Sequence, residues 1–252
     1  DNAAIVENVP ISRDGTLKGW LPIMYGCNNF CTYCIVPYVR GRERSRAPEE
    51  IIKEATEMVQ SGFKEIMLLG QNVNSYGLGE SHGINFAKLI RMINDIPGDF
   101  RIRFMTSHPK DCTDELLDAI RDCKKVERHI HLPFQSGSSK ILKQMNRRYD
   151  REGYLKLISA ARERIPDVEF TSDIIVGFPG ETYEDFCETL SLVKEVKFTS
   201  LFTFIFSPRE GTPAAAMPDP ISREEKGKWF DELLRLQEEI AEKNIQKHIQ
   251  NT

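Results

Sequence analysis

Three of the six cysteines in this chain, Cys27, Cys31 and Cys34, lie within eight residues of one another. Thiolates are soft ligands that suit zinc or iron–sulfur clusters. Structural zinc is almost always four-coordinate, but the next cysteine along the chain is Cys112. A [4Fe–4S] cluster held by three cysteines keeps one iron open to a ligand, as catalysis at a metal requires. The spacing therefore predicts such a cluster. The alternatives are a zinc site that borrows a distant ligand, or ordinary buried thiols.

Alternating strands and helices must position these cysteines. Short apolar runs indicate strands at residues 20–25, 66–69, 101–106, 126–132, 168–176 and 200–206. Apolar residues at helical spacing indicate helices at residues 47–62, 86–93, 113–123, 140 onward, 151–164, 182 onward and 222–245. Six such repeats predict an α/β fold with a parallel sheet and right-handed crossovers. We expect a partial, TIM-like (β/α)6 barrel, with a doubly wound sheet as the alternative. The cysteines follow its first strand.

Composition and charge restrict the class of protein. The 252 residues are 40% hydrophobic and 29% charged, as in an ordinary globular chain. No apolar run approaches the ~20 residues of a membrane span, and the first residues lack the basic and apolar regions of a signal peptide. Clustered cysteines without those features are typical of metal binding in a reducing compartment. We therefore expect a cytoplasmic protein that has no contact with a membrane.

Four arginines follow the cysteines at Arg40, Arg42, Arg44 and Arg46. The net charge of −4 argues against a general binder of polyanions. A basic segment beside one site instead favours a local contact with phosphates. A solvated charged loop is the alternative interpretation of the same residues.

Small and polar residues follow the expected strands, at the sheet edge where sites gather in α/β folds. They include Gln71, Asn72, Ser107, His108, Gln135, Ser136, Gly177 and Glu181. The segment at Ser136 precedes a helix and could bind an anion, although helix capping explains part of it. Asp173 lies in an apolar strand and needs a partner if it is buried. For His108, a loop residue is the more ordinary interpretation than an acid or base.

The cysteine spacing, with Tyr33 directly before the third cysteine, resembles the radical S-adenosylmethionine (SAM) superfamily. The resemblance implies the partial barrel of that superfamily, with Cys27, Cys31 and Cys34 as the ligands of a catalytic [4Fe–4S] cluster. It implies that the open iron chelates SAM, and that one electron cleaves SAM to methionine and a 5′-deoxyadenosyl radical. An electron donor of the flavodoxin or ferredoxin type is implied as a partner.

The same resemblance implies a set of SAM contacts. Gln71 and Asn72 would lie near the amino group, and the donors of Arg148 could clamp the carboxylate. The segment from Gly177 to Glu181 resembles the adenine-side motif, and Phe206 would offer a stacking edge. The full set of expected cofactor contacts is Tyr33, Gln71, Asn72, Ser107, Gln135, Ser136, Arg148, Asp173, Gly177, Glu181 and Phe206.

Five longer segments are similar to the methylthiotransferases within that superfamily. They are residues 25–41, 69–74, 106–109, 131–138 and 175–181. The second and third segments resemble the bacterial branch that modifies N6-isopentenyladenosine beside the tRNA anticodon. The resemblance implies that a methylthio group is added to C2 of that adenosine, and that Arg40, Arg42, Arg44 and Arg46 meet tRNA phosphates. The base would have to leave the stack of the anticodon loop.

Other features of the family are expected outside this sequence. We interpret residues 1–19 as a linker from a preceding domain that would carry a second, sulfur-donating [4Fe–4S] cluster. Residues 20–250 form the expected radical SAM core, and an RNA-binding β domain would follow. The oligomeric state is expected to be a monomer. The alternatives are sister branches that act on a ribosomal protein or on threonylcarbamoyl-adenosine tRNA, or a non-catalytic module that binds zinc and RNA.

Overall fold

The structure is a computed structural model that describes residues 5, 7, 15, 17–80 and 82–250. Most of the linker expected at residues 1–19 lies outside this part of the chain. Within the described part, no helix is long and apolar enough to cross a membrane.

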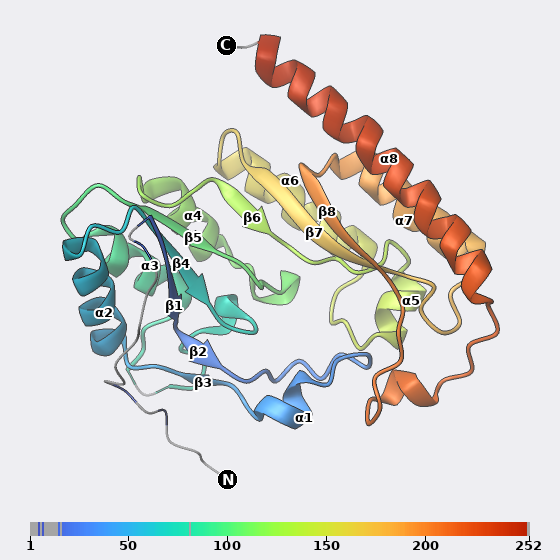
Figure 1. The fold of residues 1–252 in the computed structure, drawn as a ribbon, viewed down its shortest axis with the longest axis horizontal. Helices are drawn as coiled ribbons and strands as arrows, with labels where there is room; N and C mark the ends of the chain where they lie inside the picture. Colours follow the sequence, from blue (N-terminus) through green and yellow to red (C-terminus); the bar gives the residue numbers. More distant parts are fainter. Residues whose placement is uncertain (1–4, 6, 8–14, 16, 81, 251–252) are drawn as a thin grey trace.

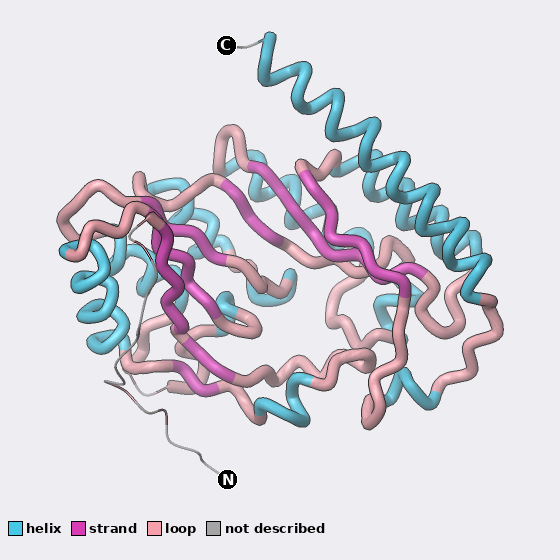
Figure 2. The backbone as a smooth tube through the Cα atoms, in the orientation of Figure 1, coloured by secondary structure: helices cyan, strands magenta, loops and turns pink. Residues whose placement is uncertain are grey.

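Six parallel strands carry the fold, and their order in space follows their order in the chain (Figure 1). They are β1 (Lys18–Pro22), β4 (Glu65–Leu69), β5 (Arg101–Phe104), β6 (His129–His131), β7 (Glu169–Val176) and β8 (Ser200–Ile205). The first three strands pair with one another, as do the last three, and a parallel bridge between Ile102 and Val126 links the two groups. Figure 2 shows the strands as one arc. The expected partial (β/α)6 barrel is confirmed.

The first strand differs from its expected range. It begins at Lys18 because that residue pairs with Glu65 of β4 in the sheet register and through an ion pair of 3.1 Å. It ends at Pro22, which lies opposite Leu69, the last residue of β4. The chain then forms β2 (Met24–Tyr25), which pairs in antiparallel fashion with β3 (Arg44–Ser45). This small hairpin brackets the cysteine segment.

Helices follow the strands nearly as expected. They are α1 (Val36–Arg40), α2 (Pro48–Gln60), α3 (Phe86–Asn94), α4 (Asp114–Asp122), α5 (Ser139–Gln144), α6 (Arg151–Arg164), α7 (Tyr183–Val196) and α8 (Arg223–Gln250). Short 3₁₀ turns lie at η1 (Val73–Ser75), η2 (Pro109–Asp111) and η3 (Pro213–Ala216). Side chains of Asn85, Thr113 and Asp150 cap α3, α4 and α6 by accepting from backbone N–H groups. Only α1 was not expected from the sequence.

The two faces of the strands have different surroundings. On β7, Phe170, Ile174 and Val176 point into the core that includes Phe186 and Val193 of α7. Their alternation with Thr171, Asp173 and Ile175 places the latter on the concave face, because successive side chains of a strand point to opposite sides. The hydrophobic core therefore lies between strands and helices and leaves the concave face available for a site.

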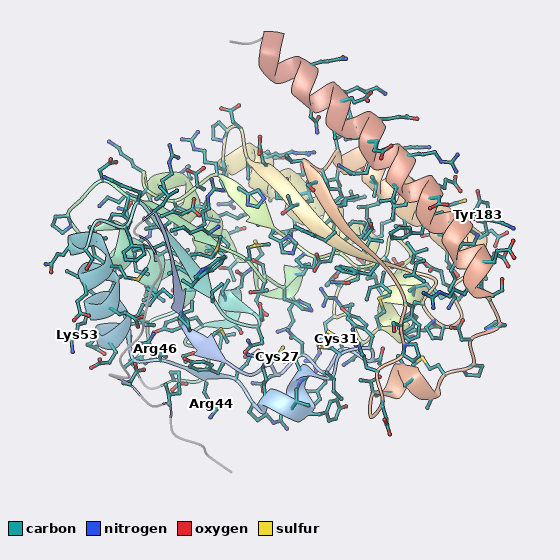
Figure 3. The ribbon with its side chains drawn as sticks, viewed as in Figure 1. Cys27, Cys31, Arg44, Arg46, Lys53 and Tyr183 are labelled. Atoms are coloured by element: carbon teal, nitrogen blue, oxygen red, sulfur yellow. The ribbon has the colours of Figure 1, made fainter. Side chains whose placement is uncertain are left out.

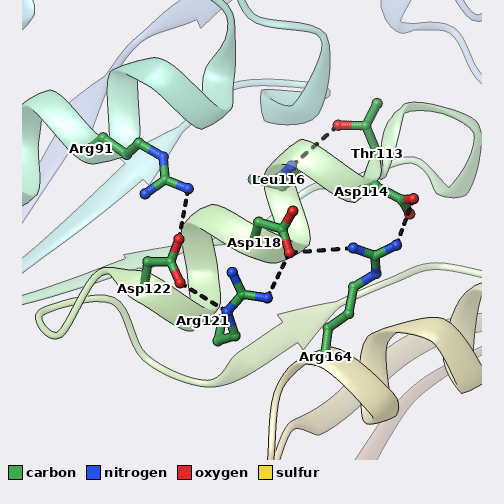
Figure 4. Close-up of polar contacts among 8 residues, drawn as sticks. All are labelled: Arg91, Thr113, Asp114, Leu116, Asp118, Arg121, Asp122 and Arg164. Atoms are coloured by element: carbon green, nitrogen blue, oxygen red, sulfur yellow. Dashed lines mark hydrogen bonds and ion pairs between the residues drawn. The ribbon is translucent and has the colours of Figure 1, made fainter.

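Ion pairs join helices on the outer side of the barrel (Figure 4). Arg91 of α3 lies 3.0 Å from Asp122 of α4, and Arg164 of α6 lies 2.6 Å from Asp114. These pairs are partly exposed, so each contributes only about 0–1 kcal/mol. They align neighbouring helices, but the buried apolar side chains supply most of the stability.

The start of α7 offers a test of local stability. Thr182 accepts a bond from the backbone of Asp185, whose carboxylate in turn accepts from the backbone of Thr182 at 3.0 Å. These two reciprocal bonds form a capping box. Replacing Thr182 with alanine should lower the free energy of unfolding by about 1 kcal/mol, measured by urea denaturation. Thr182→Ser keeps the hydroxyl and should retain most of the stability; equal losses in both variants would contradict the cap.

Candidate active site at the carboxyl ends of the strands

The cysteines lie on the loop between β2 and α1, on the side toward which the strands point (Figure 3). Gly26 begins this loop with φ +77°, and a Cβ atom there would come 2.0 Å from the carbonyl oxygen of Arg42. The nitrogen of Cys27 donates to the carbonyl of Gly41 at 3.2 Å. Only glycine permits this close approach of two backbones, so Gly26 sets where the cysteines begin.

The C-terminal end of α5 holds the middle of the cysteine loop. Thr32 donates to the carbonyl of Met145 at 3.1 Å through its nitrogen and to that of Gln144 at 3.0 Å through its hydroxyl. The side chain of Asn146 donates to the carbonyl of Phe30 at 2.9 Å. Phe30 and Asn146 both have positive φ angles, of 48° and 58°. The cysteine loop is thus held in a strained conformation by contacts more than a hundred residues away in sequence.

The three sulfurs lie in a mostly apolar setting. Cys27 and Cys31 are 9% and 6% exposed, and Cys34 is half-buried. Burial raises the pKa of Cys27 to about 11 and also raises that of Cys34. Burial therefore disfavours the thiolates of Cys27 and Cys34, and a cation bound beside their sulfurs would favour ionisation. Among the described residues, no group of three or more His, Cys, Asp or Glu is arranged to hold a single metal ion.

Arg147 provides one positive charge at the sulfurs. Its guanidinium donates to the carbonyl of Pro133 at 2.8 Å, to the hydroxyl of Tyr149 at 2.9 Å, and to Cys31 Sγ at 3.4 Å. Arg147 is 8% exposed, and within the described part of the chain no carboxylate forms an ion pair with it. A buried cation without a carboxylate is expensive. The folded site is therefore complementary to an anion at this position.

The sequence pointed to the neighbouring arginine. Arg148, the expected clamp for the SAM carboxylate, is exposed, whereas Arg147 is buried against Cys31. Both residues follow α5 and carry a guanidinium that could bind a carboxylate, so residue type does not separate them. Burial distinguishes the two residues, because only Arg147 is buried beside Cys31, while the clamp expected at Arg148 stays a prediction.

The loops after β4 and β5 are joined to each other. The hydroxyl of Thr106 donates to the carbonyl of Gly70 at 2.6 Å, and the nitrogen of Val73 donates to the carbonyl of Thr106 at 3.1 Å. The amide of Asn72 donates to Asp111 at 2.6 Å. Thr106 has φ +63°, a rare angle for a β-branched residue that marks local strain.

Several buried polar atoms on these two loops have no hydrogen-bond partner in the described structure. They are Gln71 Oε1, Asn72 Oδ1, Ser107 Oγ and both amide atoms of Asn74. An unpaired buried polar group typically costs about 1–3 kcal/mol. This accumulation at one sheet edge is typical of a ligand site. Gln71, Asn72 and Ser107 were expected cofactor contacts, while Asn74 was missed because nothing in sequence separates it from an ordinary loop residue.

The loop after β6 is held by hydrogen bonds to β7 and α7 as well as by one within the loop. Gln135 has φ +67°, and its nitrogen donates to the carbonyl of Asp173 at 2.9 Å. Ser136 is fully buried, and its hydroxyl accepts from the nitrogen of Ser138 at 3.2 Å. The hydroxyl of Ser138 donates to Asp185 at 2.8 Å. Ser136 and Ser138 therefore serve the loop, whereas Gln135 stands at its strained turn.

The loop after β7 is organised around Glu181. Its carboxylate accepts from the backbone nitrogens of Gly177 at 2.5 Å and of Phe178 at 3.2 Å. Gly177 has φ +71°, and a Cβ atom there would come 2.4 Å from the side chain of Lys226. Phe206 packs edge-on against Phe178, with ring centres 5.4 Å apart. Glu181 is thus an internal brace for the loop, and Phe206 is positioned from the next strand.

These strand ends lie around a cysteine loop, and comparison with known proteins matches residues 21–193 to the radical SAM superfamily. This chain belongs to the radical SAM superfamily. The tRNA-2-methylthio-N(6)-dimethylallyladenosine synthase of Thermoanaerobacter pseudethanolicus is 58% identical over 96% of this chain and 51% of its own length. The enzyme of the same name from Acetivibrio thermocellus is 56% identical over 94% of this chain and 49% of its own length. The chain thus spans about half the length of the curated relatives it matches.

Solved structures of the superfamily share the fold. The radical S-adenosylmethionine methyltransferase TsrM from Kitasatospora setae has a TM-score of 0.66 and 19% identity, over 84% of this chain and 42% of that one. Coproporphyrinogen III oxidase from Escherichia coli has a TM-score of 0.62 and 17% identity, over 89% of this chain and 53% of that one. At these identities the likeness supports the barrel alone.

Membership of the radical SAM superfamily confirms two predicted cofactors, a [4Fe–4S] cluster and SAM. The observed site fits both. Iron can supply the positive charge that the buried thiols need in order to ionise, and each cysteine of such a cluster binds a different iron, so the sulfurs need not surround one point. An anion beside Arg147 would balance its buried charge. The second cluster, expected on a preceding domain, stays a prediction.

The radical SAM loop also carries the basic segment, but its arginines differ in position. Arg40 and Arg42 are exposed, and the guanidinium of Arg42 lies 5.0 Å from the ring centre of Phe30. Arg46 is buried and bound to Glu7 at 2.6 Å and to Glu54 at 2.8 Å. The expected contact of Arg46 with a phosphate is therefore corrected, because two carboxylates already neutralise it. Arg44, next to it in Figure 3, is half-buried.

The surroundings of His108 disfavour a role as an acid or base. Burial, with a further contribution from Arg147, lowers its pKa to about 2. Its Nδ1 atom accepts from the backbone nitrogen of Lys110 at 3.2 Å, and this bond caps the start of η2. The neutral loop residue considered from the sequence is the better interpretation.

Glu181 should make the stability of this radical SAM domain depend on pH. Burial raises its pKa from 4.5 to about 7 despite the two backbone donors. The folded state then binds the proton more tightly than the unfolded state, so the free energy of unfolding falls as pH rises between these values. Glu181→Gln stays neutral and should remove up to about 3 kcal/mol of the difference between about pH 4 and about pH 8. Urea denaturation measures it, with Glu242→Gln as the exposed control; equal pH slopes in all three proteins would contradict the shift.

Proposed function

We propose that this chain is the radical SAM domain of a tRNA methylthiotransferase, which adds a methylthio group to C2 of N6-isopentenyladenosine in the anticodon loop. The observation that carries this proposal is 56–58% identity, over at least 94% of the chain, to enzymes named for that product. The sister branches remain the alternative activities, but no observation favours them. The zinc-binding module is not favoured, because the chain belongs to a superfamily of SAM enzymes.

Different residues would bind the cluster and SAM. Cys27, Cys31 and Cys34 would hold the cluster, and Arg147 would balance the charge of the anionic groups beside Cys31. When bound, the cluster and SAM supply a 5′-deoxyadenosyl radical that can abstract hydrogen from an unactivated carbon. The unpaired atoms of Asn72 and Ser107 would donate to or accept from the polar end of SAM. Gly177 and Phe206 would lie against its adenine.

The protein contributes geometry and exclusion of water. Contacts of Thr32 and Asn146 hold the cysteine loop against α5, so the sulfurs keep their place when the cluster binds. Burial raises the pKa of Tyr33 well above its usual range, so the phenol should keep its hydrogen. Its hydroxyl lies beside Arg147 and can donate a hydrogen bond there. A buried, preorganised site of this kind protects a reactive radical from side reactions.

The RNA would approach the exposed side of the cysteine loop. Arg40 and Arg42 are available there for phosphates, and Phe30 and Tyr38 form an edge-on aromatic pair with ring centres 5.7 Å apart. Arginine together with exposed aromatic rings is typical of surfaces that bind unpaired nucleotides. Tyr38 is 53% exposed. The electron donor, the cytoplasmic location and the monomeric state expected from the family belong to this proposal.

One assay tests the proposed activity. The full-length protein would be reconstituted anaerobically with iron and sulfide, reduced, and given SAM with an anticodon stem-loop that carries N6-isopentenyladenosine. Mass spectrometry of the digested RNA should show the 2-methylthio nucleoside. The ribosomal protein and a threonylcarbamoyl-adenosine RNA serve as competing substrates. Product from one of these, and none from the isopentenyl RNA, would replace the proposed branch by a sister branch.

A further inference from the structure

A chain of polar side chains runs along the concave face of β6 and β7. His129 Nε2 and His131 Nδ1 each lie 3.0 Å from the hydroxyl oxygen of Thr171, and His131 Nε2 lies 3.4 Å from Asp173 Oδ1. The single hydroxyl hydrogen of Thr171 can serve only one histidine, so the other must donate to it. If Thr171 donates to His131 Nδ1, the second ring nitrogen of His131 carries a hydrogen that faces Asp173. This arrangement of hydrogen bonds gives each of the four side chains a partner and orients the carboxylate of Asp173.

Apolar side chains extend from the end of this polar chain toward the cysteine loop. In the sheet register Asp173 lies opposite Phe202 and Ile175 lies opposite Phe204. Ile175 packs into the small core cluster that Tyr33 and Phe206 also contact. The side chains at alternate positions of β7 and β8 therefore form one strip, which leads from the expected cofactor site down the concave face.

Phe202 on this strip is unusually exposed. The interior of a closed barrel is filled by side chains, but Phe202 is 46% exposed and Phe204 is 54% exposed. Phe202 meets His131 edge-on, with ring centres 5.7 Å apart. Asp173 keeps 30% of its side chain exposed beside it. An apolar ring and a carboxylate thus lie together on the concave face, and no described residue bonds to the second carboxylate oxygen of Asp173.

We propose that Asp173, His131 and Phe202 form the recognition site for the substrate nucleobase; this rests on the proposed function. An adenine alkylated once on N6 keeps a single N6–H, and the ionised carboxylate of Asp173 is a pure acceptor that can receive it. Phe202 contacts the apolar alkyl group, whose burial is favourable in proportion to its area. His131 is a positioning residue that holds the carboxylate. Asp173 is thereby assigned to the substrate and not to SAM, the role expected from the sequence.

The site predicts a specific order of RNA affinities. The probes are anticodon stem-loops that carry N6-isopentenyladenosine, unmodified adenosine or N6,N6-dimethyladenosine, which has no N6–H. Fluorescence anisotropy with the full-length protein, without reductant, gives each Kd. The isopentenyl RNA should bind best, because it alone offers both the N6–H and a large alkyl group. The dimethyl RNA should bind about tenfold more weakly or worse, since it leaves Asp173 unpaired.

The variants separate the two contacts. Phe202→Ala should reduce the preference for isopentenyl over unmodified RNA about tenfold. Asp173→Leu should remove the discrimination against the dimethyl RNA, and His131→Leu should weaken it. His131→Gln keeps an N–H for Asp173 and should retain the discrimination against the dimethyl RNA. A merely structural role of His131 would not explain this rescue. Thr203→Ser, on the opposite face of β8, is the matched control, and thermal melting identifies variants that fail to fold.

The outcomes distinguish this inference from the proposed function. A wild-type protein that binds all three RNAs equally would contradict both. If the wild type shows the expected order of RNA affinities and this order persists in Phe202→Ala and Asp173→Leu, the recognition site alone would be wrong. The site would also be wrong if these two variants weakened SAM binding while leaving the RNA preferences unchanged, because the residues would then line the cofactor site.

Discussion

Replacing Cys31 with alanine should reduce SAM cleavage more than a thousandfold, because the sulfur is proposed as one of only three protein ligands of the cluster. Cys31 is buried, and its sulfur is the one that Arg147 contacts. Its loss would leave a cluster with two protein ligands and a buried guanidinium without its anion. The measurement is 5′-deoxyadenosine formed by the reconstituted, reduced protein, together with its iron and sulfide content. We expect both to fall together.

Cys187 provides the matched control for this prediction. It is an exposed cysteine on α7, away from the cysteine loop. Cys187→Ala should keep its iron content and its rate of SAM cleavage within a factor of about two. If Cys31→Ala formed 5′-deoxyadenosine at the wild-type rate, the three-cysteine site would be wrong. Uptake of one zinc in preference to iron by the wild type would restore the binding-module alternative.

Replacing Arg147 with leucine should lower SAM cleavage by a factor of about 10² to 10³, the usual effect of removing one preorganised donor from a buried site. The guanidinium is the buried cation that has no carboxylate partner among the described residues. Leucine keeps the site apolar but leaves the anionic groups without a counter-charge. The rate of 5′-deoxyadenosine formation and the Kd for SAM would measure this effect.

The stability of the same variant separates function from folding. Pro133 would keep a donor, since the Tyr149 hydroxyl also lies 3.2 Å from its carbonyl oxygen. Removing an unpaired buried charge should therefore leave the free energy of unfolding of the cluster-free chain unchanged or raise it. Arg148→Leu, at the exposed neighbour, should change the rate less than about threefold. A large effect at Arg148 with none at Arg147 would reverse the assignment.

Local signals in the sequence were sufficient for most of the fold. Apolar runs with turn residues between them identified all six strands of the arc, since a strand buried on its helix-covered face must be apolar. The helices expected from residues 113 and 182 begin there, and the side chains of Thr113 and Thr182 bond to the nearest backbone groups. The early start of β1 was not visible locally. Its pairing with Glu65 joins residues 47 positions apart, 18 and 65.

The sequence could predict a site where the chemistry depends on spacing along the chain. Three cysteines in eight residues can bind one cluster whatever surrounds them. Residues that act through burial were not predictable in this way. Arg147 and Arg148 are adjacent and chemically identical in sequence, and packing alone buries the first. Arg46 continues a basic run, yet contacts with Glu7 and Glu54 remove it from the surface.

The sequence by itself thus determined the order of strands and helices and the superfamily, and it predicted the cluster ligands, because each depends on residue type and short-range spacing. The tertiary structure decided which polar groups are buried, which of them lack partners, and which charges are already neutralised. These properties arise from contacts between distant segments, such as Thr32 with Met145 or His131 with Asp173. The proposed recognition strip through Asp173 and Phe202 belongs to this second kind. It exists only because parallel strands bring their side chains into register.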